Sequence, residues 1–418
     1  MSFANKYLMR HSVFDAMISE QPQKDLNYIV VIPVYYEPDV ILSLESLYNC
    51  KPVESSVEVI IIINSSSNAE DYVKDQNRKT ESHIHNWTKN HRNNKFRFHI
   101  LHFPDLAKKY AGAGMARKIG MDIAISRFHS INNPEGIIIS FDADSICDKN
   151  YFTEIDRIFK NKPETNACTI YFEHPFEGEL FDKDIYDGII HYELYIRYYK
   201  QSLQYTGFPF AYYTIGSCFA VKAKVYVKQG GMNRKKAGED FYFLNKVFPK
   251  GNIIELNSTR VIPSPRPSKR VPFGTGPEIE KWIKEKKLNV YNFQAFKDLS
   301  AFLQKYEIFR QITDKEEHIK EVSALPDAIG QFLVKNDFYS EINIIKADCK
   351  TVSSFEKRFF QWFDSFKVIK YLNFAHDNYY SKTPVCLAAI EFLEHVGVEK
   401  PIKADALYLL KIFRKLEP

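Results

Sequence analysis

The sequence predicts an α/β protein: a Rossmann-like, mixed but mostly parallel sheet flanked by helices, followed by a mainly α-helical C-terminal region. Residues 28–34 (Y-I-V-V-I-P-V), 57–63 (V-E-V-I-I-I-I) and 137–141 (I-I-I-S-F) are short apolar runs, typical of strands buried on both faces of a parallel sheet. Helix-like segments separate the first strands, and this alternation favours crossover connections. From residue 277 onward the pattern is helical, with no strong strand.

The elements follow in order along the chain. Residues 1–25 are expected to form a short helix and a polar lead-in. Asp39 is expected to cap the helix after the first strand, because Asp is favoured at that position. Gly216 predicts a close backbone approach within a strand. The expected strands cover residues 28–34, 57–63, 96–103, 137–141, 166–172 and 213–221. The expected helices cover residues 40–48, 68–95, 111–124 and 186–205, and Glu239 and Asp240 stand just before a further helical pattern.

Composition sets limits on the function. The 418 residues are 45% hydrophobic and 26% charged, which is ordinary for a soluble globular protein of two or three domains. The 57 basic and 52 acidic residues give a net charge of only +5, too balanced to indicate nucleic acid as the main partner. A local basic site for an anionic ligand remains compatible with this balance. The 33 Phe and 26 Tyr belong mostly to the core, with some available for sugar platforms or a membrane-facing patch.

The cysteines and the apolar runs predict a compartment. None of the six cysteines forms a C-x-x-C pair, so neither a zinc site nor a disulfide framework is indicated, and reduced thiols are expected. The N-terminal residues lack an apolar signal region, and no run reaches the roughly 18 apolar residues of a membrane span. We therefore expect a cytoplasmic protein, with peripheral membrane contact as an open alternative.

Two carboxylates follow the apolar run that ends at Phe141. Asp142 and Asp144 stand where a parallel strand should end, which is the edge of the sheet where ligands bind. In an extended chain residues i and i+2 point the same way, so both carboxylates can converge on one cation. Mg²⁺ is often held by one or two carboxylates together with phosphates of the substrate. The hypothesis is a metal that grips a nucleotide diphosphate; the alternative is a simple turn and helix cap.

A glycine-rich segment, A-G-A-G-M-A-R-K, opens the helix expected at residues 111–124. Exposed amides at a helix start suit phosphate, and Arg117 and Lys118 add charge-assisted hydrogen bonds. The alternative is a small-residue turn where helix and sheet pack closely. A nicotinamide fingerprint fits poorly, because the glycines follow the third strand rather than the first.

Residues 261–276 are rich in proline and glycine and hold the cations Arg266, Lys269 and Arg270. This segment is either a basic linker or a loop that closes over the diphosphate. We place the domain boundary after it. Residues 1–276 are the expected catalytic domain, and residues 277–418 are an expected helical region for acceptor binding or oligomerisation.

Taken in order over about residues 27–275, five segments resemble the family 2 glycosyltransferases of the GT-A fold. They are I-P-V-Y-Y-E, A-G-A-G-M-A-R-K-I-G, S-F-D-A-D, G-S-C-F-A-V-K-A-K-V-Y-V-K-Q-G-G-M and A-G-E-D. The resemblance implies a GT-A fold, a nucleotide-sugar donor, an acceptor hydroxyl and a divalent metal, Mn²⁺ or Mg²⁺. It implies a glycosyltransferase of the hexosyltransferase class, active in glycan or glycoconjugate biosynthesis.

The resemblance also assigns roles to residues. Asp142 and Asp144 match the metal motif, with Asp144 as the direct ligand and Asp142 also facing the donor. Glu239 and Asp240 match the acidic pair whose second member is the catalytic base. The other residues assigned to donor binding are Pro33, Tyr35 and Glu37 around the nucleoside, and Gly112, Gly114 and Arg117 along the sugar and diphosphate. Asn64, Arg266 and Arg270 complete the expected donor site.

Each role has a chemical reason. The diphosphate leaving group needs neutralisation, which a metal supplies as a Lewis acid. The acceptor hydroxyl must lose a proton to a positioned carboxylate as it attacks the anomeric carbon. Nothing in the sequence demands the nucleophilic carboxylate of a double displacement, so we expect inversion.

Two departures from the family pattern affect these expectations. The second strand ends in Asn64 rather than the usual acidic residue, so a GDP-sugar donor remains an alternative to the favoured UDP-sugar. No histidine lies between Asp240 and His318 to serve as a further metal ligand.

Three other functions stay open. A haloacid-dehalogenase-like phosphatase would use Asp142 as nucleophile, although Ile146 stands where that family has Thr or Val. A nucleotidyltransferase would need a glycine-rich basic loop after the first strand, which residues 33–38 are not. A non-catalytic scaffold that binds nucleotide-sugar would not need an intact set of carboxylates.

Overall fold

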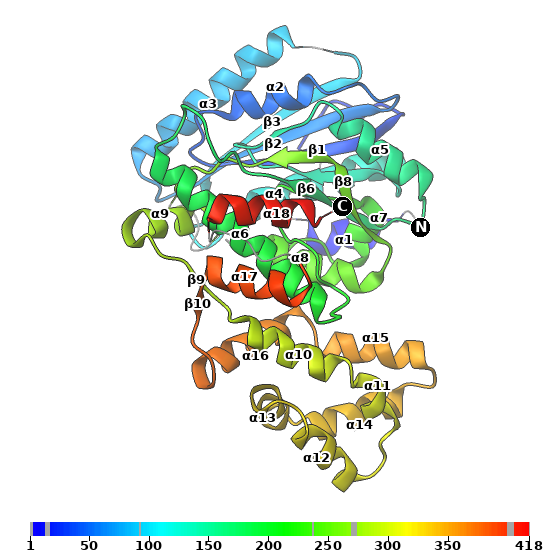
Figure 1. Ribbon diagram of the computed structural model, residues 1–418. Coiled ribbons are helices and arrows are strands. Elements are labelled where there is room, and N and C mark those ends of the chain that lie inside the picture. The colour runs from blue at the N-terminus through cyan, green and yellow to red at the C-terminus, as the bar shows by residue number, and fades with distance from the viewer. Residues whose placement is uncertain are drawn as a thin grey trace. The chain divides into compact units, whose positions relative to one another are not determined.

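The computed structural model describes residues 3–12, 17–91, 93–235, 238–268, 274–398 and 405–417. They group into two compact units (Figure 1). The first comprises Met1–Gly178 and Tyr213–Pro277, and the second comprises Glu179–Tyr212 and Glu278–Pro418. The division at residues 276 and 277 stays a prediction about domains. The structure adds that residues 179–212, which we expected within the catalytic domain, group with the C-terminal helices.

The first unit is built on an eight-stranded sheet in the order β3-β2-β1-β4-β7-β6-β8-β5. The pairs β1–β2, β1–β4, β2–β3 and β6–β8 are parallel, whereas β7 runs antiparallel to both β4 and β6, and β5 is antiparallel to β8. The predicted fold class is therefore confirmed. The strands are β1 (Leu26–Val34), β2 (Ser56–Ser66), β3 (Phe96–Leu106), β4 (Ile137–Ser140), β5 (Ile146–Cys147), β6 (Ala167–Phe172), β7 (Phe219–Lys222) and β8 (Ile253–Ile262).

Three of these strands differ from the prediction, and one of them, the two-residue β5, was not predicted. The strand expected at residues 213–221 begins only at Phe219, and Gly216 lies in the irregular segment before it. Strand β8 was not predicted at all, because polar residues interrupt its apolar ones. The helices of the first unit are α1 (Asn5–His11), α2 (Val40–Tyr48), α3 (Asp71–Asn90), α4 (Ala113–Ser130), α5 (Tyr151–Asn161), α7 (Ala223–Lys228) and α8 (Glu239–Val247).

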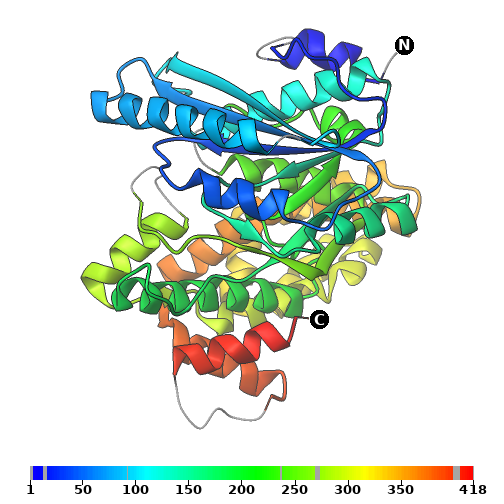
Figure 2. The same ribbon diagram turned by 90° about the horizontal axis from the view of Figure 1, so that it is seen from above.

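Helices cover both faces of the parallel half of the sheet (Figure 2). On one face, Trp87 of α3 packs edge-on against Phe98 of β3, with ring centroids 5.1 Å apart. On the other face, α4 lies so close that a Cβ at Gly120 would overlap Val31 of β1. The predicted isoleucine and valine runs are thus buried from both sides, which explains why they lack the alternation of a half-exposed strand.

Helix α4 is buried on nearly all sides and carries charges that are paired internally. Lys118 Nζ donates to Asp122 Oδ2 at 2.9 Å, and Tyr7 Oη of α1 donates to Asp122 Oδ1 at 2.6 Å. Farther along the helix, Arg127 pairs with the buried Glu58 of β2. Buried charges need such partners. Lys118, which the glycine-rich segment had associated with phosphate, therefore serves the packing of α1 on α4.

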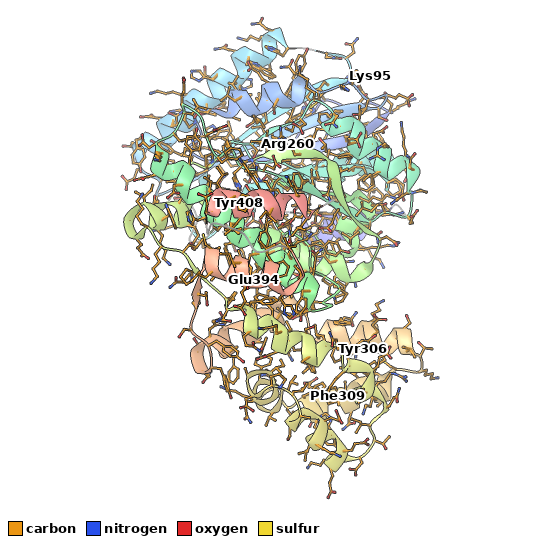
Figure 3. All side chains as sticks on the ribbon, in the orientation of Figure 1. Lys95, Arg260, Tyr306, Phe309, Glu394 and Tyr408 are labelled. Atoms are coloured by element: carbon orange, nitrogen blue, oxygen red, sulfur yellow. The ribbon has the colours of Figure 1, made fainter. Side chains whose placement is uncertain are left out.

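The second unit is mainly helical, as predicted. Aromatic side chains pack against one another within it: the ring of Phe309, labelled in Figure 3, meets Phe338 edge-on with centroids 5.0 Å apart. A two-stranded ladder joins β9 (Asn289–Val290) and β10 (Thr383–Pro384). The helices are α6 (Lys183–Tyr205), α9 (Thr275–Glu285), α10 (Phe293–Leu303), α11 (Tyr306–Gln311), α12 (Lys315–Ser323), α13 (Asp327–Lys335), α14 (Phe338–Asp348), α15 (Val352–Trp362), α16 (Ser365–Asn378), α17 (Val385–His395) and α18 (Ala406–Lys415).

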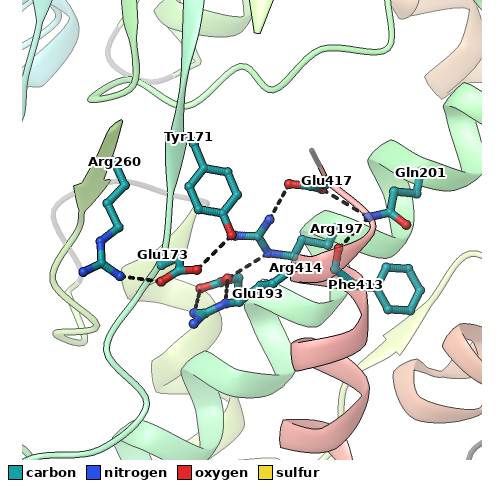
Figure 4. Close-up of polar contacts among 9 residues, drawn as sticks. All are labelled: Tyr171, Glu173, Glu193, Arg197, Gln201, Arg260, Phe413, Arg414 and Glu417. Carbon is teal, nitrogen blue, oxygen red and sulfur yellow. Dashed lines mark hydrogen bonds and ion pairs between the residues drawn. The ribbon is translucent and has the colours of Figure 1, made fainter. Parts of the chain in front are cut away.

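An internal ion network joins α18 to α6 (Figure 4). The fully buried Glu193 accepts from Arg197 Nε at 2.8 Å and from Arg414 Nε and Nη2 at 2.8 and 2.9 Å. Arg197 also pairs with Glu417 just beyond α18. This network explains why α6 belongs with the C-terminal helices. Within the described ranges, no helix is both long and apolar enough to cross a membrane.

Candidate functional site

The Asp142–Ala143–Asp144 segment forms a turn directly after β4, at the carboxyl end of the parallel strands. Ser145 N donates to Asp142 O at 3.2 Å, which closes the turn, and Ser43 Oγ of α2 donates to Ala143 O at 2.8 Å. Both carboxylate side chains remain partly accessible, with 35% of the Asp142 side chain and 26% of the Asp144 side chain exposed. The turn that the alternative interpretation predicted is present. It places two carboxylates at the edge of the sheet where ligands bind.

Arg117, in the first turns of α4, connects this turn to the acidic pair of α8. Its Nη2 donates to Asp142 Oδ1 at 2.5 Å, and its Nη1 pairs with the buried Glu239. Gly216 lies against the same group: a Cβ there would be 2.8 Å from Arg117 Nη2 and 3.0 Å from Asp240 Oδ2. Three carboxylates from two distant segments therefore gather around one guanidinium. The close approach at Gly216 is present, but it is to side chains, and Gly216 lies before the strand rather than within it.

Asp240 occupies an environment that changes its acidity. Gly238, whose φ of 70° is left-handed, turns the chain into α8 so that Glu239 and Asp240 stand in the first helical turn. Burial raises the pKa of the Asp240 carboxyl above its ordinary value, and the Asp142 carboxylate raises it further, while the Arg117 guanidinium opposes both effects. A carboxylate with a raised pKa is a stronger proton acceptor, which suits a general base.

Arg266 ties the proline-rich loop to the loop after β1. It pairs with Glu37, a carboxylate that is only 1% exposed, and its Nη1 lies 3.6 Å from Asp39 Oδ2. Its Nη2 is 3.7 Å from Asp144 Oδ2. Glu37, Asp144 and Arg266 were predicted separately, and the structure brings them together. Arg270, the other predicted cation of this loop, lies outside the described residues.

Asn64, at the end of β2, uses both ends of its amide within the chain. Its Oδ1 accepts from Gly112 N at 2.8 Å, and its Nδ2 donates to Val34 O at 3.3 Å. Gly112 has a φ of 145° and a ψ near 180°, a conformation that side chains rarely adopt. Asn64 thus joins the ends of β1 and β2 to the start of α4.

Gly114 allows a second close approach at the same helix start. A Cβ there would overlap Lys235 O and lie 3.1 Å from Glu239 Oε2. The glycines therefore permit close packing between α4 and the segment before α8. The interpretation that favoured packing over phosphate binding is supported at Gly114, where protein backbone fills the space beside the residue.

The loop after β1 holds the remaining predicted residues. Pro33 is buried within β1 opposite Ile62, and Tyr35 is half-buried just after the strand. Tyr36 was not predicted, yet it is the exposed aromatic of this loop. Its φ is 50°, its backbone N donates to Asn77 Oδ1 at 2.9 Å, and its ring meets Tyr72 edge-on at 5.4 Å. The Y-Y dipeptide was a signal for this loop, but it could not tell which ring faces solvent.

The side chains at this turn supply only part of the ligands that a hard cation needs. Among the described residues, no group of three or more His, Cys, Asp or Glu side chains is arranged to hold a metal. Asp142 and Asp144 supply two carboxylates, and Mg²⁺ or Mn²⁺ bound there would take its other ligands from substrate oxygens and water. The approach of Arg117 to one carboxylate and of Arg266 to the other shows that the turn attracts positive charge. The residues therefore fit a metal held jointly with a diphosphate.

No protein-family model matches the sequence, and no curated protein matches it. Solved structures show low similarity. S. aureus TarS 1–349 in complex with UDP-GlcNAc is 13% identical, with a TM-score of 0.41 over 72% of this chain and 79% of that chain. The mannosyltransferase PcManGT from Pyrobaculum calidifontis, in complex with GDP-Man and Mn²⁺, is 12% identical, with a TM-score of 0.37 over 89% of this chain and 93% of that chain. With TM-scores below 0.5, these similarities carry no weight for the function of this chain.

Proposed function

We propose that the protein is a metal-dependent glycosyltransferase that moves a sugar from a nucleotide-diphosphate donor, with a UDP-sugar favoured, to an acceptor hydroxyl. The observation that carries the proposal is the double pairing of Arg117 with Asp142 and Glu239. It joins a two-carboxylate turn, suited to a metal and a diphosphate, to the helix start that carries Asp240. A haloacid-dehalogenase-like phosphatase would carry Thr or Val where this chain has Ile146.

The donor's diphosphate would bind at the Asp142–Asp144 turn. These two carboxylates would hold Mn²⁺ or Mg²⁺, which neutralises the leaving group when bound. Arg266 reaches within 3.7 Å of Asp144, so its guanidinium is in range of a phosphate held at that turn. The loop after β1, with Tyr35 and the buried Glu37, would take the nucleoside. Asn64 would support this loop from β2 rather than contact the base, because its amide is already used.

Asp240 would accept the proton of the acceptor hydroxyl as that oxygen attacks the anomeric carbon. Its raised pKa makes it a better base than an ordinary aspartate, and positioned proton transfer contributes about 10²–10⁴ in rate. Arg117 would keep Asp240 ionised by opposing the effects of burial and of Asp142. A single attack opposite the leaving group inverts the anomeric configuration.

The two parts of the chain would divide the work. Residues 1–276 would form the catalytic domain, and residues 277–418 would contribute acceptor binding or oligomerisation. The six cysteines, all free thiols, are in keeping with the proposed reducing, cytoplasmic location.

Donor hydrolysis tests the proposal without knowledge of the acceptor, because water can replace the acceptor hydroxyl. UDP- and GDP-sugars are incubated with the wild type and Mn²⁺, and release of UDP or GDP is measured. We expect Asp240→Asn and Asp144→Asn to reduce release by about 100-fold or more. Asp105→Asn, at a carboxylate that is 68% exposed at the end of β3, should retain wild-type release. Release of phosphate from p-nitrophenyl phosphate with no turnover of nucleotide-sugars would contradict the proposal.

A further inference from the structure

Four cations from two segments form a basic patch on the first unit. Lys108 and Lys109 follow β3, and Arg234 and Lys235 precede α8. All four side chains are exposed. Over the residues that the structure describes, none of the four forms an ion pair with a carboxylate. We call Lys108, Lys109, Arg234 and Lys235 the basic patch.

The Tyr110 ring brings the two segments together. Lys109 Nζ lies 4.7 Å from the centroid of the Tyr110 ring, and Arg234 Cζ lies 6.0 Å from the same centroid. Lys235 Nζ lies 3.3 Å from the centroid of the Tyr242 ring. A hydrogen bond from the Lys109 side chain, the charge of Lys109 and a hydrogen bond from Arg234 lower the pKa of the Tyr110 hydroxyl. The patch therefore concentrates like charge that no carboxylate among the described residues balances.

The basic patch borders the side of the candidate site that carries the base. The backbone of Lys235 touches Gly114, and a Cβ at Gly114 would be 3.1 Å from Glu239 Oε2. Glu239 in turn precedes Asp240. A group bound at the patch would therefore lie next to the helix start where we place deprotonation of the acceptor.

We propose that the basic patch binds an anionic acceptor glycan, one whose repeating units carry phosphate or carboxylate groups. The inference rests on the proposed function, since it names the class of acceptor. A neutral acceptor would be held by hydrogen bonds and stacking, which need no unbalanced cations. The donor diphosphate already has the Asp142–Asp144 turn and Arg266. An anionic polymer matches the charge of the patch.

Binding of labelled glycans tests the proposal in the absence of donor. The probes are fluorescent heparin and hyaluronan oligosaccharides, neutral dextran of equal length, and phosphatidylglycerol vesicles. The variant carries Lys108→Gln, Lys109→Gln, Arg234→Gln and Lys235→Gln. A matched control removes four exposed cations elsewhere in the same unit, Lys24→Gln, Lys51→Gln, Lys149→Gln and Lys228→Gln. We expect the patch variant to bind heparin or hyaluronan about tenfold or more weakly, and the control to bind as the wild type does.

Several outcomes would overturn the proposal. They are equal binding of dextran and the charged glycans, unchanged glycan affinity in the patch variant, and binding of vesicles without binding of glycans. Loss of UDP-sugar binding in the patch variant would also overturn it, because the patch would then belong to the donor site. Donor hydrolysis is measured separately with Asp240→Asn and Asp144→Asn, so a failure of the proposed function is distinguishable from a failure of the anionic patch.

Discussion

Arg117→Met is the sharpest perturbation of the candidate site, because one guanidinium holds two acidic segments. Methionine is of similar length, so the change removes charge and hydrogen bonds more than volume. The Arg117 and Glu239 side chains are each only 4% exposed, and removing one partner of such a pair costs about 3–5 kcal/mol. The Asp142 side chain is 35% exposed, so solvent screening limits its share to about 1 kcal/mol at most.

We therefore expect Arg117→Met to lose about 4 kcal/mol of stability, a fall in Tm of roughly 10 °C for a unit of this size. Thermal unfolding followed by circular dichroism at neutral pH measures it. Arg117→Lys is the matched control: it keeps the charge but not the fork that reaches two carboxylates, and should lose less.

The double variant Arg117→Met/Glu239→Gln separates pairing from packing. Removing both charges should restore part of the loss, with a coupling energy of about 2 kcal/mol between the two sites. A loss below about 1 kcal/mol for Arg117→Met, or strictly additive single effects, would refute the view that this pair organises the site.

Three further predictions concern stability and turnover. Burial raises the pKa of Asp240 in the folded protein, so the folded chain binds a proton at this carboxyl more tightly than the unfolded chain does. The free energy of unfolding therefore falls as the pH rises from about 4 through the folded pKa. Asp240→Asn should thus have a higher Tm than the wild type, by a margin that grows from about pH 5 to pH 8; a constant margin would speak against the raised pKa. Gly216→Ala would put a methyl group 3.0 Å from Asp240 Oδ2. We expect kcat for donor hydrolysis to fall about tenfold or more, with a stability loss of about 1–3 kcal/mol. An unchanged kcat would exclude the close approach. Glu193→Gln would leave Arg197 and Arg414 without their shared carboxylate, so α18 should become sensitive to proteolysis with a loss of about 3–5 kcal/mol, and an unaltered digestion pattern would argue against the network.

Local pattern predicted the parallel half of the sheet well, because the strands buried on both faces are continuous apolar runs. Helix α2 begins and ends at the predicted residues, Val40 and Tyr48. Strand β8 escaped prediction because Asn257, Ser258 and Thr259 interrupt its apolar residues. Helix α6 was recognised, but an amphipathic pattern tells only that one face is buried. It could not tell that this face packs with the C-terminal helices.

In the candidate site, too, short motifs predicted individual residues, whereas their contacts depend on segments that are distant along the chain. Asp142, Asp144 and Asp240 were found because short motifs mark strand ends and helix starts. Arg117 was assigned to a diphosphate, whereas its pairing with Asp142 and Glu239 depends on segments 25 and 122 residues away along the chain. Asn64 was assigned to the donor, yet its amide joins strand ends, a role that only the folded neighbours define.

The most direct test of the central claim is calorimetric titration of a UDP-sugar into the protein with and without Mn²⁺. The account predicts that donor binding requires the metal, is lost in Asp144→Asn, and is retained in Asp240→Asn, which should nevertheless fail to turn over. Donor binding that is independent of Mn²⁺, or that survives in Asp144→Asn, would contradict it.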